Sequence, residues 1–186
     1  FKPGILPLKV EEVYLDKQGK KQKRECLMDT DEGPRADTSP EALARLKPVL
    51  AANGSITAGN SSQTSDGASF VIGMSERMVN QLVLKPICRL VGCASAGVHP
   101  RIMGVGPVEA VPKVLKQVGM NLSQIDLIEL NEAFASQSLA VIRKLGLNPD
   151  IVNINGGAIA LGPPLGCTGC KLTVKITHEM KRLTKK

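Results

Sequence analysis

The sequence predicts a layered α/β fold, and three observations support this prediction. Short apolar segments alternate along the chain with segments whose apolar residues recur at helical spacing. Aromatic residues make up only 2% of a chain that is 42% hydrophobic, so the core must consist of Val, Ile, Leu and Ala, which is typical of strands buried under helices. A glycine-rich stretch at residues 155–169 joins an apolar segment to a helical one.

The glycine-rich stretch is the feature around which the chain is organised. Residues 151–154 before it are expected to form a short buried strand, and a helix is expected after it. The apolar face of that helix consists of Leu172, Ile176, Met180 and Leu183. Glycine lets a ligand or another backbone approach closely, and a helix N-terminus attracts anions. The alternative is a tight structural corner that binds nothing.

The N-terminal part is expected to form a β-hairpin followed by a short helix. Residues 5–15 and 21–27 have strand character and flank a turn signal at 17–20. Residues 40–46 begin with proline and follow Ser39, which predicts a short helix with Ser39 as its N-cap.

The middle of the chain begins with an unusual run of small and hydroxyl residues at 57–67. This run is either a flexible loop or a segment shaped for close backbone contact, because it leads directly into the apolar segment 68–74. Residues 68–74 and 87–96 are expected to be strands, and 75–82 a short helix. Residues 97–107 are rich in glycine and proline and are expected to be a loop.

The C-terminal third is expected to contain two further helices and a strand. Residues 108–118 predict a helix that tolerates Pro112 only in its first turn. Residues 127–130 predict a short strand, and 132–145 a helix that Gly146 ends. The residues expected to face inward from this helix are Phe134, Leu139, Ile142 and Leu145.

Composition argues against several classes of partner and cofactor. The net charge is +7, but aromatic side chains that could stack on bases are scarce, so no nucleic-acid partner is expected. A basic surface also suits a small molecule that carries phosphate. No apolar run is long enough to span a bilayer, so no membrane partner is expected.

The five cysteines are irregularly spaced, which favours a reduced, intracellular protein over a disulfide framework. Cys167 and Cys170 form a single C-x-x-C pair without a second pair to complete a zinc site. No metal site is therefore expected.

Four motifs along the chain resemble those of the thiolase family. Residues 57–67 resemble the family's Ala-Gly-Asn-x-Ser coenzyme A loop, and residues 103–107 resemble its Met-Gly-x-Gly-Pro turn. Residues 131–134 resemble its Asn-Glu-Ala-Phe motif, and residues 156–162 resemble its Gly-His-Pro block. The order and spacing of all four agree, and the resemblance is strongest to the 3-ketoacyl-CoA thiolase branch, also called acetyl-CoA C-acyltransferase.

The resemblance implies a thiolase-like layered α/β fold with a mixed sheet and helices. Residues 1–65 would be a segment of the thiolase loop region with the coenzyme A loop, and residues 66–186 a C-terminal domain that lacks its last strands. The implied reaction is thiolysis or Claisen condensation of 3-ketoacyl-CoA, as in fatty-acid β-oxidation. The substrate is a coenzyme A thioester, and no separate cofactor is expected.

Specific residues match the family's functional positions. Asn131 matches the asparagine that holds an oxyanion water, Arg35 and Ser62 match contacts to coenzyme A, and Met103 matches a methionine near the pocket. Gly162 and Gly166 match backbone positions of the catalytic loop. Taken singly, these residues would be interpreted as a helix cap, a surface charge, turn formers and ordinary packing.

The sequence also departs from the family at the catalytic groups. Pro163 stands where the family has its catalytic histidine, and proline has neither a titratable group nor a backbone N–H. None of the five cysteines stands at either catalytic cysteine position, and the nucleophile and the C-terminal Cys-x-Gly motif are expected outside this chain. The chain alone is therefore expected to be inactive.

Two alternatives remain open, and so does the setting of the protein. The chain could be a non-catalytic coenzyme A-binding module or the partner half of a split thiolase, or it could be a poorly folded fragment with an unpaired sheet edge. Either a homo-oligomer or an N-terminal-half partner chain is expected. The location would be cytoplasmic in a bacterium, and mitochondrial or peroxisomal in a eukaryote.

Overall fold

The computed structural model describes residues 4–183 of the chain. The chain divides into two compact units, residues 1–36 and residues 37–186. Each unit is described by itself below. The boundary predicted between residues 65 and 66 follows the division of the thiolase family's sequence and not the contacts within this structure, and it stays a prediction.

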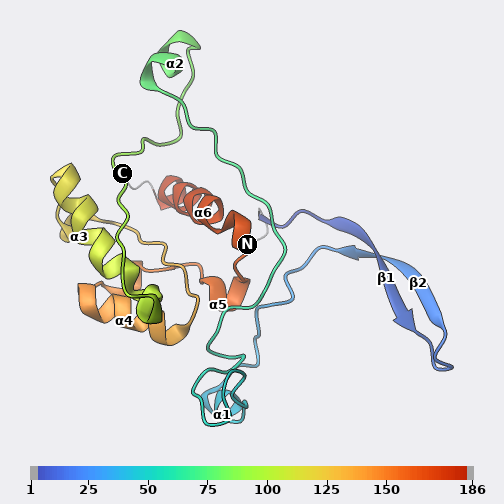
Figure 1. The fold of residues 1–186 in the computed structure, drawn as a ribbon. Helices are drawn as coiled ribbons and strands as arrows, with labels where there is room; N and C mark the ends of the chain where they lie inside the picture. Colours follow the sequence, from blue (N-terminus) through green and yellow to red (C-terminus); the bar gives the residue numbers. More distant parts are fainter. Residues whose placement is uncertain (1–3, 184–186) are drawn as a thin grey trace. The chain divides into compact units, whose positions relative to one another are not determined.

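The first unit is an antiparallel β-hairpin (Figure 1). Strand β1, Leu8–Leu15, pairs with β2, Lys21–Met28, in a register that runs from Leu8 opposite Met28 to Leu15 opposite Lys21. The turn is closed by the Asp16 N–H, which donates to the Lys20 carbonyl oxygen at 3.0 Å, and Gly19 provides its positive φ of 76°. The predicted hairpin is confirmed, because its turn chemistry and strand pattern are both local signals.

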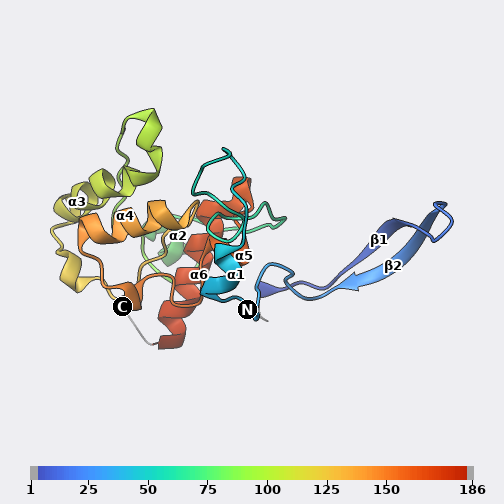
Figure 2. The same ribbon diagram turned by 90° about the horizontal axis from the view of Figure 1, so that it is seen from below.

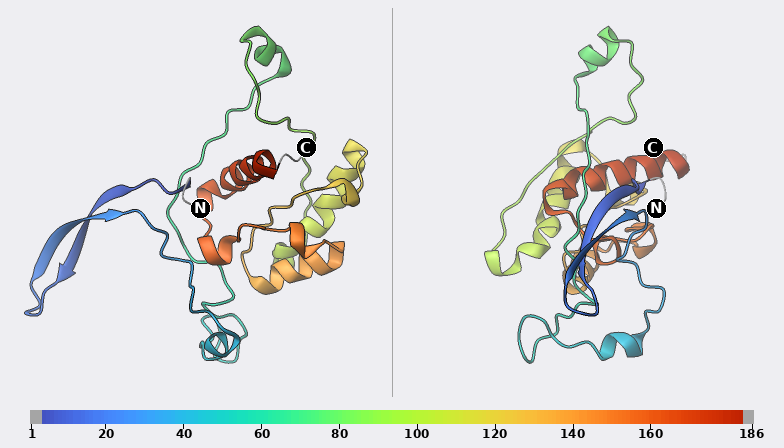
Figure 3. Two further views of the ribbon diagram at one scale, coloured as in Figure 1. Left: turned by 180° about the vertical axis from the view of Figure 1, so that it is seen from behind. Right: turned by 90° about the vertical axis from the view of Figure 1, so that its right-hand side faces the viewer.

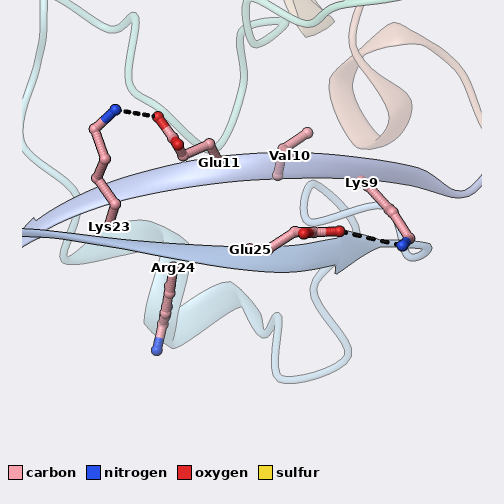
Figure 4. A pocket seen from close by; sticks show the side chains of 6 residues that line it. All are labelled: Lys9, Val10, Glu11, Lys23, Arg24 and Glu25. Carbon is pink, nitrogen blue, oxygen red and sulfur yellow. Dashed lines mark hydrogen bonds and ion pairs between the residues drawn. The ribbon is translucent and has the colours of Figure 1, made fainter.

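Charged side chains on the hairpin compensate one another across the strands. Glu11 lies directly opposite Glu25, but Lys23 pairs with Glu11 at 2.7 Å and Lys9 pairs with Glu25 at 3.2 Å (Figure 4). These residues line a hollow of about 330 Å³ that holds only exposed ion pairs. Exposed pairs stabilise a fold by only about 0–1 kcal/mol. The charged side chains of these two ion pairs are thus exposed to solvent and compensate one another.

The second unit consists of helices joined by long connections. Its α-helices are α1, Pro40–Ala44; α2, Glu76–Gln81; α3, Gly106–Val118; α4, Ala135–Leu145; α5, Ala158–Leu161; and α6, Thr168–Leu183. Its 3-10 helices are η2, Pro100–Val105; η3, Leu122–Gln124; η4, Pro149–Ile151; and η5, Leu165–Cys167. The predicted cap is confirmed, because the Ser39 hydroxyl accepts a hydrogen bond from the Ala42 N–H at 3.1 Å.

The core of this unit lies where α3 and α4 pack together (Figures 1 and 2). Leu130, Val141 and Leu147 are buried at its centre. Partly buried side chains surround them, namely Val108, Leu122, Ile128, Ile142, Leu145 and Val152.

The predicted inner face of α4 was wrong in two of its four residues. Phe134 is the N-cap residue rather than part of the helix, and Leu139 is 47% exposed. The inward row is Ser138, Val141, Ile142 and Leu145, which follows the i, i+3, i+4, i+7 spacing. Leu139 lies outside this row, one residue after Ser138, and therefore points to the exposed side of the helix.

Most predicted strands are not formed among the described residues. The segments 68–74 and 87–96 have no strand assignment, and side chains such as Phe70 (87%) and Leu90 (81%) are exposed. The segments 127–130 and 151–154 meet only at a single parallel bridge between Ile128 and Val152. A strand requires a neighbour that pairs its N–H and C=O groups, and an apolar pattern alone cannot provide one.

The prediction for Pro112 was also wrong. Helix α3 begins at Gly106, with Pro107 in its first turn, so Pro112 lies inside the helix in its second turn. The prediction for Gly146 is confirmed, because this glycine ends α4 with a φ of 62°. Helix α6 follows the short α5 almost directly (Figure 3), and the helix predicted after the glycine-rich stretch is thereby confirmed.

Two properties bear on partners and cofactors. Between residues 4 and 183, no helix is both long and apolar enough to cross a bilayer. Within the same part of the chain, no three His, Cys, Asp or Glu side chains gather closely enough to hold a metal ion.

Candidate functional site

The loop at residues 57–67 has a fixed conformation. The Asn60 side chain accepts a hydrogen bond from the Thr57 N–H at 2.8 Å and donates to the Ser55 carbonyl oxygen at 2.8 Å. The Ser61 hydroxyl donates to the Thr57 carbonyl oxygen at 2.7 Å. The small and hydroxyl residues of this run therefore form a shaped loop, which is one of the two alternatives that the sequence left open.

This loop pairs with the segment that contains Asn131. The Ser62 N–H donates to the Ala133 carbonyl oxygen at 3.0 Å, and the Ala135 N–H donates to the Asn60 carbonyl oxygen at 2.9 Å. Ser61 and Phe134 form an isolated antiparallel bridge. Two motifs far apart in sequence thus come together in one short two-stranded contact.

Asn131 lies two residues before Ala133, at the edge of this contact, and its side chain has an unusual feature. Its side-chain oxygen, Oδ1, is buried and has no hydrogen-bond partner among the described residues. A buried carbonyl without a partner costs about 1–3 kcal/mol, so such an atom is a natural binding point for a water or a ligand donor.

The residues on either side of Asn131 are anchored to the glycine-rich stretch. The Asn153 side chain bonds to both backbone groups of Leu130, accepting from its N–H at 2.8 Å and donating to its carbonyl oxygen at 2.9 Å. Asn153 also donates to Glu132 Oε1 at 2.7 Å, and Glu132 Oε2 accepts from the Ile159 N–H at 3.2 Å.

The glycine-rich stretch packs too closely for side chains at two positions. A Cβ atom on Gly157 would overlap the Glu132 carboxylate, and a Cβ atom on Gly162 would overlap the Ser65 hydroxyl. Gly162 also has a φ of 70° and a ψ of 149°, a conformation that is essentially restricted to glycine. The loop 57–67 and the glycine-rich stretch are therefore in direct contact.

Two lysines of α6 hold the beginning and the middle of the same stretch. Lys171 Nζ donates to the Gly162 carbonyl oxygen at 2.8 Å. Lys175 donates to the Gly156 carbonyl oxygen and pairs with Glu129 Oε2 at 2.8 Å. Burial raises the pKa of Glu129 above its ordinary value of 4.5, and the hydrogen bond from Lys175 only partly opposes that rise.

Pro163 lies between Gly162 and the buried Pro164. The Pro164 carbonyl oxygen accepts from the Cys167 N–H at 2.9 Å and from the Thr168 hydroxyl at 3.1 Å, which fixes the start of α6. A hollow of about 350 Å³ next to it is lined by residues 65–70 and 164–167. Gly166 lies in η5, is exposed, and has open space where a Cβ atom would stand.

The remaining predicted site residues lie apart from this contact or in the other unit. Met103 is 77% exposed in η2, while the neighbouring Gly104 packs against the Gln137 side chain of α4. Arg35 is exposed and belongs to the first unit, so its role in binding coenzyme A stays a prediction. The roles assigned to Asn131, Ser62 and Met103 likewise stay predictions.

Sequence reasoning missed the anchoring residues Glu132, Asn153, Lys171 and Lys175. A weak signal existed for Asn153, because asparagine tolerates positive φ and this one precedes a glycine pair by three positions. Its φ is 49°. The lysines gave no local signal, because their partners are backbone carbonyls that only the fold brings near.

Two family models together match nearly the whole chain. The family described as "Thiolase, C-terminal domain" matches residues 84–186, and "Thiolase, N-terminal domain" matches residues 1–77. A 3-ketoacyl-CoA thiolase of Bacillus subtilis is 48% identical over 182 residues, which cover 98% of this chain and 46% of that protein.

Solved structures give the same result. The Bacillus anthracis acetyl-CoA acetyltransferase has a TM-score of 0.82 and 42% identity, over 97% of this chain and 43% of that one. Human mitochondrial 3-ketoacyl-CoA thiolase in complex with CoA has a TM-score of 0.78 and 43% identity, over 86% of this chain and 41% of that one. The chain spans less than half the length of each of these relatives. The predicted thiolase-like α/β fold is confirmed, and the chain belongs to the thiolase family.

Proposed function

We propose that the chain provides part of the acyl-CoA site and the oxyanion asparagine of a thiolase-type C-acyltransferase. The reaction would be thiolysis or Claisen condensation of 3-ketoacyl-CoA. The observation that carries this proposal is the buried, unpartnered Oδ1 of Asn131, held beside the loop that contains Ser62.

The chemistry of the reaction requires donors aimed at an oxygen that gains negative charge. A water bound to Asn131 Oδ1 would present its other hydrogen to a thioester oxygen, and a donor in a site shielded from bulk solvent stabilises such charge strongly. The nucleophile and the proton shuttle of this chemistry are cysteine side chains. The proposal therefore includes no cofactor besides the coenzyme A thioester, which is the substrate.

Binding of coenzyme A to the purified chain tests this proposal. We expect a dissociation constant on the order of millimolar, about −4 kcal/mol. Removal of the Arg35 charge in Arg35→Ala should cost about 0–1 kcal/mol, because an exposed ion pair is worth no more. Binding should weaken as salt rises, since salt screens charges.

Ligand-observed NMR or calorimetry at two salt concentrations measures these effects, with Ser62→Ala as the second variant. Arg143→Ala on the exposed face of α4 is the matched control for loss of a cation. Tight, salt-insensitive binding that is unchanged in Arg35→Ala and Ser62→Ala would show that the site assignment is wrong.

A second candidate function is that of a partner half for a chain with the rest of a thiolase. It is favoured by the exposed apolar segments 68–74 and 87–96 and by the share of each relative that this chain covers. Mixing the chain with the N-terminal half of a relative, followed by analytical ultracentrifugation, should give a one-to-one complex that Phe70→Asp and Ile72→Asp weaken. Self-association of the chain alone would favour a homo-oligomer instead.

A further inference from the structure

On the N-terminal side of Asn131, the backbone of Leu130 is held by the side chain of Asn153. Beyond the Ile128–Val152 bridge, Asn153 turns into the left-handed region, with a φ of 49°, and its backbone leaves the direction of a strand. Its side-chain amide then bonds to the N–H and the C=O of Leu130, as a peptide group of a neighbouring strand would. Only asparagine has a donor and an acceptor at this length.

A side-chain anchor holds the C-terminal side. Glu132 uses one carboxylate oxygen for the Asn153 amide and the other for the Ile159 N–H at the start of α5. Gly157, the N-cap residue of α5, has no side chain that could cap the helix. The Glu132 carboxylate occupies the space where a side chain at position 157 would lie. Both partners of Glu132 are donors, so the position requires two acceptors.

We infer that Asn153 and Glu132 are positioning residues that together fix Asn131 relative to the glycine-rich stretch. Leu130 and Glu132, the two neighbours of Asn131, are both held, which sets where the Asn131 amide points. The same carboxylate holds α5, whose end is Gly162, directly before residue 163. The pair thus links the oxyanion asparagine to the position where the family has its catalytic histidine.

Two isosteric substitutions test the hydrogen bonds of Asn153 and Glu132, a pair called the clamp below, without changing side-chain volume. In Glu132→Gln, one acceptor becomes an NH2 group that must face a donor, and in Asn153→Asp the donors to Leu130 and Glu132 are lost. Gly157→Ala displaces the carboxylate without removing it. Glu109→Gln on the exposed side of α3 is the matched control for the loss of a carboxylate.

The measurement is NMR on the ¹⁵N-labelled, ligand-free chain. The Leu161 and Gly162 amides, which bond to Gly157 and Ala158, should exchange with solvent about 10- to 100-fold faster in Glu132→Gln, the effect of losing a charge-assisted hydrogen bond. The Asn131 side-chain amide signal should move in all three variants, while exchange at Val141 in the core stays unchanged.

Unchanged Leu161, Gly162 and Asn131 signals would overturn the inference. Faster exchange at Val141 to the same degree would also overturn it, because the pair would then only hold the fold. The effect on acyl-CoA affinity rests on the proposed function. If the wild-type chain bound no coenzyme A but the ligand-free signals changed as expected, the clamp would stand and the proposed function would fall.

Discussion

At the scale of single residues, the glycines of the 155–169 stretch have unequal importance. Gly157 and Gly162 face groups that leave no room for a side chain, namely the Glu132 carboxylate and the Ser65 hydroxyl. Gly166 faces open space and does not have a positive φ. Glycine is therefore required for steric reasons at positions 157 and 162, whereas position 166 has room for a side chain.

The first prediction compares Gly162→Ala with Gly166→Ala. A Cβ atom at position 162 must displace Ser65 and adopt a conformation that costs about 1–3 kcal/mol, so we expect a loss of unfolding free energy of that size. Gly166→Ala should change it by about 0.5 kcal/mol or less. Urea denaturation of both variants measures the difference, and equal effects at the two positions would contradict the packing described here.

At the scale of elements, helix α6 takes part in two ion pairs in which the pKa of the carboxylate is shifted in opposite directions. Glu129 is buried against Lys175, and burial raises its pKa above 4.5. Glu179, one turn before the end of α6, bonds to Arg182, and this hydrogen bond holds the pKa of Glu179 below 4.5. The two carboxylates should therefore affect stability with opposite dependence on pH.

The second prediction follows from these signs. The lowered pKa of Glu179 means that its stabilisation is present above pH 4.5 and is lost as pH falls through the folded-state pKa. Glu179→Gln should then lose about 0.3–0.5 kcal/mol near neutral pH and match wild type in acid. The raised pKa of Glu129 means that wild type loses stability as pH rises through it, so Glu129→Gln should gain relative to wild type over that range.

Urea denaturation of wild type and both variants from about pH 3 to pH 7 measures these slopes. The stability difference between each variant and wild type is the quantity of interest. If both differences moved in the same direction with pH, the assignment of burial to Glu129 and of charge pairing to Glu179 would be wrong.

At the scale of the whole molecule, the resemblance predicts that the groups that would complete the proposed reaction are missing from this chain. Pro163 offers no donor and no titratable group, and none of the five cysteines is expected at a catalytic cysteine position of the family. Groups that act as a unit give little when only one is present.

The third prediction is that the 186-residue chain does not catalyse thiolysis, and that Pro163→His does not change this. The assay follows the loss of the enolate absorbance of a 3-ketoacyl-CoA. Steady turnover by the purified chain would refute the first part. Turnover only in Pro163→His would indicate that a cysteine present here acts as nucleophile, and alkylation mapping would show whether it is Cys167.

The sequence by itself determined the local elements and the family. The hairpin, the capped helix after Ser39, α3, α4 and α6 depend on turn chemistry, caps and apolar spacing, which act over a few residues. The predictions that failed were of another kind. The strands at 68–74 and 87–96, and the inward position of Leu139, depended on which other segments pack against them.

Only the tertiary structure decided how the candidate site is assembled. The contact of Ser62 with Ala133 and the link from Asn153 through Glu132 to Ile159 join segments far apart in the chain. The burial of the unpartnered oxygen of Asn131 is likewise a property of the folded chain. Such contacts form when packing across the whole unit repays the entropy of closing long loops, and no local pattern encodes that balance. The motifs thus named Ser62 and Asn131, whereas only the fold showed that Asn153 and Glu132 connect the Asn131 segment to the glycine-rich stretch.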